Sequence, residues 1–113
     1  MERIYHLVVP STWYSASHED LMVASLVDEG FIHCAFGSQV AWAANRFYRD
    51  VPALLALEID ASRLTSPLKV EPPPGKPSSD RLFPHIYGPL QRAAVVVVHE
   101  LQRGPDGQWQ FTP

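Results

Sequence analysis

Three histidines stand in short apolar and aromatic motifs that lie far apart in the chain. His6 lies in IYHL, His33 in EGFIHC and His85 in FPHIYG. An imidazole can donate or accept a hydrogen bond, stack on a ring or bind a metal near neutral pH. One such histidine alone is more often a hydrogen-bonded core residue. The occurrence of three, each in its own motif, favours a shared site, and we predict that the three segments line one pocket.

Three further polar residues are candidates for the same pocket. Glu71 ends the strand predicted at 68–71, just before a proline-rich loop, although an exposed strand-end carboxylate explains it equally well. Tyr87 lies two residues after His85, so the two side chains share a face if that segment is extended. Gln39 falls in the first turn of the helix after His33, where its amide either reaches a ligand or is simply solvated.

The remaining reactive side chains have structural interpretations. Cys34 adjoins His33, but neighbours on a strand face opposite ways, so the two cannot form a nucleophile–base pair. A buried, inert thiol is the simpler interpretation of Cys34. His18, in the first turn of a predicted helix, and His99, in a late strand, are interpreted as structural.

Length and composition indicate one soluble domain spanning residues 1–113. The 9 basic and 12 acidic residues give a net charge of −3, which offers no footprint for nucleic acid or an anionic membrane. A single cysteine excludes an internal disulfide and a cysteine-rich zinc motif. No signal segment is seen, and no apolar run approaches the ~20 residues of a membrane span. We therefore expect a cytoplasmic protein with a small-molecule ligand.

The pattern of apolar residues predicts an α+β domain with a mainly antiparallel sheet and two principal helices in the N-terminal half. The helices are predicted after Ser17, to about Glu29, and after Ser38, to about Asp50. Strands are expected at 3–9, 30–35, 54–59, 68–71 and 108–112. The continuous apolar run at 93–101 predicts a central strand buried on both faces. Residues 72–80 are too rich in proline to pair in a sheet.

The motifs taken together resemble a known family almost end to end. IYH at 4–6, EGFIHC at 29–34, LEID at 57–60 and FPHIYGPL at 83–90, with Gln39 and Glu71, resemble the small bacterial domain-of-unknown-function family 952. The serine that usually follows the cysteine in that family is Ala35 here. The family looks like a compact, divergent member of the ADP-ribosyltransferase superfamily, which uses NAD.

This resemblance implies an ADP-ribosyltransferase-like fold with a strongly bent sheet, and roles for individual residues. His6 takes the first motif position, His33 the second, and His85 replaces the glutamate of the third, because no glutamate opens the strand at 93–101. The implied catalytic set is His6, His33 and His85, and the implied NAD-binding set is His6, His33, Gln39, Glu71 and Tyr87. His6 would bind the ribose hydroxyls and His33 would stack on nicotinamide, while His85 and Tyr87 would orient the ribose or acceptor.

The expected function is therefore cleavage of the nicotinamide–ribose bond of NAD, with transfer of ADP-ribose to an acceptor or to water. Such a site must stabilise the positive charge that builds on the sugar. Two alternatives stay open. One is a non-catalytic module that binds a nucleotide or small metabolite. The other is a metal-dependent hydrolase with three histidine ligands, although the chain lacks the HExxH spacing of helical zinc ligands.

Overall fold

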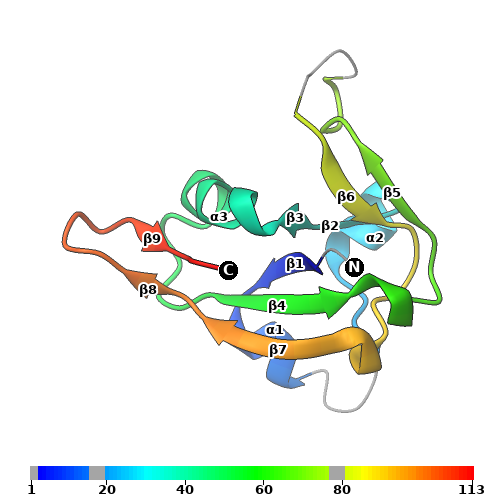
Figure 1. The fold of residues 1–113 in the computed structure, drawn as a ribbon, viewed down its shortest axis with the longest axis horizontal. Coiled ribbons are helices and arrows are strands. Elements are labelled where there is room, and N and C mark those ends of the chain that lie inside the picture. Colours follow the sequence, from blue (N-terminus) through cyan, green and yellow to red (C-terminus); the bar gives the residue numbers. More distant parts are fainter. Residues whose placement is uncertain (1–2, 16–19, 77–80) are drawn as a thin grey trace.

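The computed structural model of the protein describes residues 3–15, 20–76 and 81–113, and Figure 1 shows their arrangement. In chain order the elements are β1 (Arg3–Val8), α1 (Pro10–Ser15), α2 (Ala24–Glu29), β2 (Ile32–His33), β3 (Ala35–Phe36), η1 (Gly37–Gln39), α3 (Val40–Phe47), β4 (Leu55–Asp60), η2 (Ala61–Arg63), β5 (Leu68–Glu71), β6 (Phe83–Ile86), η3 (Arg92–Ala94), β7 (Val95–Glu100), β8 (Gln102–Arg103) and β9 (Trp109–Gln110).

The strands form two main sheets and a small hairpin. Strands β3, β1, β4 and β7 make a four-stranded sheet, and β2, β6 and β5 make a three-stranded one. Every pairing in them is antiparallel. Only Cys34 separates β2 from β3, so the chain passes there from one sheet directly into the other. Figure 1 shows β5 and β6 projecting away from the larger sheet as an arm. The predicted α+β class with antiparallel sheets is confirmed.

Strand β1 lies at the centre of the core because both of its faces are covered. Ile4 and Val8 belong to a cluster that also contains Ile32 and Ile86 of the three-stranded sheet. Leu7, like Tyr5, belongs to a second cluster with residues of α3 and β9. Successive side chains of β1 therefore face opposite clusters, as the two-residue period of a strand requires. The first cluster joins the two sheets, so it fixes the position of the arm relative to β1.

Helix α3 packs through residues at three- and four-residue spacing, of which Val40, Ala43 and Ala44 are buried. The predicted helix is shorter than expected, since residues 37–39 form a 3₁₀ turn and α3 ends at Phe47. Phe47, the last residue of α3, is 65% exposed. Its ring makes an edge contact with Trp42 on the outer side of the helix.

The prediction of a central strand at 93–101 is wrong. Among the described residues, strand β7 lies at the edge of its sheet and pairs only with β4. Val97 and Val98 are 42% and 37% exposed. The buried interior position belongs to β4, between β1 and β7. A run of valines satisfies the β preference at an edge as well as at a centre, because that preference concerns the pleated surface rather than depth.

The first predicted helix and the second predicted strand are also shorter than expected. Helix α2 begins only at Ala24, and Leu21 forms a backbone bridge with Leu90 instead of a helical turn. Ser17, after which the first helix was predicted to begin, lies outside the described residues, as does His18. The helix does end where predicted, with Gly30 in the left-handed conformation at φ +86°. The strand expected at 30–35 is divided between the two sheets.

Two smaller expectations concern the loops. Residues 72–76, the described part of the predicted proline loop, contain no strand. The C-terminal strand is shorter than the expected 108–112 and pairs with β8 in a hairpin. Within the described ranges, no helix combines the length and apolar character needed to cross a membrane.

Candidate functional site

Aromatic rings gather on one face of the three-stranded sheet. The register of β2 on β6 places His33 opposite His85, and Phe31 lies on the same face because it is two residues from His33. The Phe31 ring stacks on His85 with centroids 4.2 Å apart and planes 28° apart. Its centroid also lies 4.8 Å from that of His33 and 5.2 Å from that of Tyr87. Phe31 is therefore the ring that holds this group together.

A carboxylate is held beside these rings by two donors. His85 Nδ1 lies 2.8 Å from Glu71 Oε1, and the Tyr87 hydroxyl donates to the same oxygen. The hydrogen bond from Tyr87 and then that from His85 lower the pKa of Glu71. The hydrogen bond between Tyr87 and Glu71 also raises the pKa of Tyr87. Glu71 is therefore an ionised acceptor near neutral pH, with Tyr87 protonated. Because both side chains contact one oxygen of Glu71, the prediction that His85 and Tyr87 share a face is confirmed.

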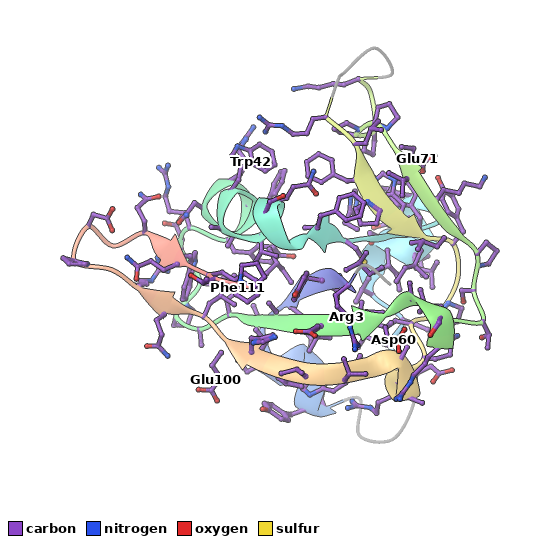
Figure 2. The ribbon with its side chains drawn as sticks, viewed as in Figure 1. Arg3, Trp42, Asp60, Glu71, Glu100 and Phe111 are labelled. Carbon is purple, nitrogen blue, oxygen red and sulfur yellow. The ribbon has the colours of Figure 1, made fainter. Side chains whose placement is uncertain are left out.

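These side chains line a pocket of about 520 Å³. Its lining, called here the aromatic pocket, is Phe31, Glu71, residues 72–75, His85 and Tyr87. The proline-rich segment thus forms one wall. The Glu71 side chain keeps 30% of its surface exposed, whereas His85 is 2% exposed. In Figure 2 Glu71 lies on the β5–β6 arm, away from Arg3 and Asp60 of the larger sheet. A ligand can therefore reach the carboxylate, while His85 acts from behind it.

His33 stands at the rim of the aromatic pocket rather than in its lining. Its side chain is 46% exposed, and its Nε2 lies 3.1 Å from Glu29 Oε1. The centroids of His33 and His85 are 5.5 Å apart, with the rings edge to face. The turn at Gly30 brings Glu29 back to this position. His33 can therefore meet the part of a ligand that extends out of the pocket.

His6 does not line the pocket, so the prediction that three imidazoles share one cavity is wrong for this residue. It is 5% exposed, and its Nδ1 lies 2.7 Å from the main-chain oxygen of His33. Its Nε2 is buried and has no hydrogen-bond partner among the residues that the structure describes. Burial lowers the pKa of His6 to about 4. The reason is strand alternation: His6 shares the face of Ile4 and Val8, and the second sheet covers that face.

Gln39 and Cys34 have structural contacts. Gln39 Oε1 accepts the Phe36 amide at 2.9 Å, and its Nε2 donates to the Leu82 carbonyl at 2.8 Å. Both ends of the amide are thus engaged, and the residue ties η1 to the start of β6. The Cys34 thiol is buried in the core, and burial raises its pKa.

The three-histidine alternative is not supported by the geometry. In ranges 3–15, 20–76 and 81–113, no group of three or more His, Cys, Asp or Glu side chains is placed to hold a metal ion. His6 is separated from the other two imidazoles by the β2 backbone, to which it bonds.

Sequence reasoning missed Phe31 and Lys69. A phenylalanine in an apolar run is usually assigned to the core, but Phe31 shares the face of His33, which was the available signal. Lys69 lies two residues before Glu71 and therefore on its face of β5. Its Nζ lies 4.6 Å from the centroid of the Tyr87 ring.

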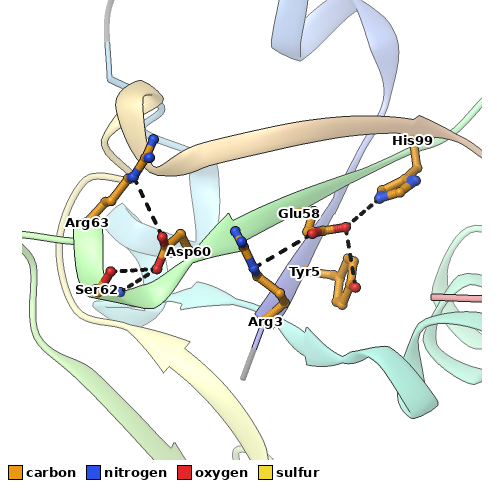
Figure 3. Close-up of polar contacts among 7 residues, drawn as sticks. All are labelled: Arg3, Tyr5, Glu58, Asp60, Ser62, Arg63 and His99. Carbon is orange, nitrogen blue, oxygen red and sulfur yellow. Dashed lines mark hydrogen bonds and ion pairs between the residues drawn. The ribbon is translucent and has the colours of Figure 1, made fainter. Parts of the chain in front are cut away.

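A second polar cluster lies on the larger sheet (Figure 3). Glu58 of β4 accepts from His99 Nε2 at 2.8 Å, and the Tyr5 hydroxyl lies 3.5 Å from the same oxygen. Arg3 Nε is 3.8 Å from the other oxygen of Glu58. The cluster joins neighbouring strands β1, β4 and β7, in agreement with the structural role expected for His99. A hollow of about 320 Å³ at the end of α3, lined by residues 45–51, contains none of the predicted site residues.

The fold and the pocket define a small α+β domain of two antiparallel sheets with an aromatic and acidic pocket on the smaller one. The family described as "Protein of unknown function (DUF952)" matches residues 7–98, and the chain belongs to it. The predicted family is therefore confirmed. No curated protein matches the chain.

Solved structures of one bacterial protein are similar to this chain. The crystal structure of protein CC0527 from Caulobacter crescentus is 29% identical, with a TM-score of 0.81 over 96% of this chain and 93% of that one. A double mutant of the same protein gives 28% identity and the same TM-score and coverage. The solution NMR structure of CC0527 is 30% identical, with a TM-score of 0.77 over 97% and 93% of the two chains.

Proposed function

We propose that the aromatic pocket binds the nicotinamide end of NAD and that the protein cleaves the nicotinamide–ribose bond. The observation that supports this most is the ionised Glu71 carboxylate, held by His85 and Tyr87 in a pocket that the rings of Phe31 and Tyr87 line. A planar ring packs favourably on Phe31 and the proline segment. In this proposal the bond from nicotinamide to the sugar lies close to the fixed negative charge of Glu71.

The chemistry requires that charge. As the bond between C1′ of the ribose and the ring nitrogen breaks, its electron pair goes to nicotinamide and positive charge develops on the sugar. A preorganised carboxylate stabilises that charge. The oxygen of water, or of an acceptor, then bonds to C1′ and loses its proton to Glu71. In this proposal Glu71 on β5 supplies the acid that the late strand lacks, and His85 positions it.

The histidines have separate roles in the proposal. His33, on the rim with Glu29, meets the ribose hydroxyls outside the pocket. His6 holds the β2 backbone at His33 and does not touch the ligand. The direct passage of the chain between the two sheets at Cys34 supports the bent, ADP-ribosyltransferase-like fold that is part of the proposal. A cytoplasmic location, where NAD is supplied, belongs to the same proposal.

A non-catalytic nucleotide-binding module is the second candidate. The burial of His6 favours it, since that imidazole is not available to bind the ribose as the first motif implies. Such a module would bind NAD through the same rings and release no nicotinamide.

Incubation with NAD separates the two candidates. We expect nicotinamide release, measured by chromatography, together with a rise in melting temperature. Glu71→Gln should slow release by about 10²–10³-fold, as for loss of one electrostatic group. Glu58→Gln is the matched control, because Glu58 also bonds a histidine at 2.8 Å but lies on the other sheet. A melting shift without release supports the binding module. If millimolar NAD gives neither nicotinamide release nor a rise in melting temperature, the proposal is refuted.

A further inference from the structure

The aromatic pocket already has a cation resting on one of its rings. The Lys69 ammonium lies 4.6 Å from the Tyr87 centroid, within the range in which a cation is attracted to the face of an aromatic ring. The position follows from the register, since Lys69 pairs with His85 and shares its face with Glu71. The ring face at this edge of the pocket is therefore arranged to receive positive charge.

The lining reinforces that preference. Among the described residues that line the pocket, Glu71 is the only one with a full negative charge, and none carries an arginine or lysine head group. The surrounding surfaces are the rings of Phe31 and Tyr87 and the proline segment at 72–74. Two interactions attract a cation to such a site: the charge of the carboxylate and the quadrupoles of the aromatic rings. A neutral ring of the same shape gains only the stacking.

We infer that the aromatic pocket selects a planar organic cation, an N-alkylpyridinium group, over the neutral ring of the same shape. The inference rests on the proposed function, because the nicotinamide of oxidised NAD is such a pyridinium. It goes further in two respects. The pocket should prefer oxidised NAD to the reduced form, whose ring is neutral. Nicotinamide should also leave readily after bond cleavage, since it departs uncharged.

Lys69 acts in this arrangement as an internal competitor. Its ammonium occupies one face of the Tyr87 ring and makes the electrostatic potential near Glu71 less negative. The same positive charge helps to lower the pKa of Glu71. Replacement by an uncharged side chain of similar length should free both groups for the ligand. Lys69→Met should therefore tighten binding of the cation several-fold and leave binding of the neutral ring unchanged.

The test compares 1-methylnicotinamide, a cation, with nicotinamide, which has the same ring and carboxamide but no charge. Binding to the full chain is followed by NMR titration. We expect the cation to bind about tenfold more tightly, which is within the range of a desolvated cation–π contact. Glu71→Gln should bring the ratio close to one, and Glu58→Gln should leave it unchanged.

Two results would overturn the inference. One is equal affinity of the wild-type protein for the two compounds. The other is a cation preference that Lys69→Met does not increase and Glu71→Gln does not reduce. If Glu71→Gln fails to fold, Lys69→Met decides the matter, because it alters only an exposed side chain of β5 and should fold normally. Nicotinamide release from NAD is measured separately, so the proposed function can fail while the cation preference holds, and the reverse.

Discussion

Acidification should destabilise the protein through His6. The Nδ1 of His6 donates to the main-chain oxygen of His33, because a carbonyl can only accept. The other nitrogen, Nε2, is then the site that gains a proton, and it is buried without a partner in the described part of the chain. Protonation would place a charge in the core between the two sheets. The native state therefore resists it, and the unfolded chain does not.

The size of the effect follows from the shift in pKa. Burial lowers the pKa of His6 from 6.5 to about 4. Above pH 6.5 the imidazole is neutral in both states and contributes no pH dependence. Between the two values the unfolded chain binds the proton and the folded one does not, so the free energy of unfolding falls by about 1.4 kcal/mol per pH unit. The loss reaches about 2 kcal/mol at pH 5 and about 3 kcal/mol near pH 4.

Urea denaturation between pH 7.5 and pH 4.5 measures this loss. His6→Leu fills the same space without a titrating group, so its free energy of unfolding should depend less on pH by the stated amount, whatever its absolute stability. His99→Gln is the histidine control, since His99 is partly exposed and paired with Glu58. The His99→Gln variant should keep the pH dependence of the free energy of unfolding that is due to His6. Parallel curves for wild type and His6→Leu would refute the reasoning.

Three further predictions concern the scaffold. Gly88→Ala should lower the free energy of unfolding in urea by about 1–3 kcal/mol, because φ of Gly88 is +152° and the new Cβ would lie 2.4 Å from Ser66 Oγ. Adding Ser66→Gly should restore part of the lost stability, and an unchanged urea midpoint for Gly88→Ala would contradict the geometry. Cys34, whose pKa burial raises, should not react with a thiol reagent at pH 8 until denaturant is added; rapid reaction of the native protein would show that the thiol is accessible. Glu58→Gln should lower the melting temperature by about 4 °C through loss of its charged contact with His99, and no change would show that the contact adds nothing to stability.

Local patterns in the sequence were sufficient to predict which residues share a face. Alternation placed His85 and Tyr87 on one face, and the hydrogen bonds of both side chains to the same Glu71 oxygen confirm it. Strand β5 was predicted with the bounds that the structure gives. These features depend on a few neighbouring residues and on the two-residue period of a strand.

The features that the sequence did not predict depend on contacts between segments that lie far apart in the chain. Alternation gave the face of His6 but not the second sheet that lies over it. The valine run of β7 fixed a strand but not its place at the edge. The bonds of Glu71 to His85 and Tyr87 require the register of β5 on β6, which a proline-rich segment separates in sequence. Long-range pairing of this kind is not encoded in any short motif.

A crystal structure of the protein soaked with NAD would test the central claim most directly. We predict the nicotinamide ring in contact with Phe31, between it and the proline segment at 72–74, with the adjoining ribose next to the Glu71 carboxylate. A nicotinamide bound elsewhere on the protein, with the aromatic pocket empty at saturating NAD, would contradict the account.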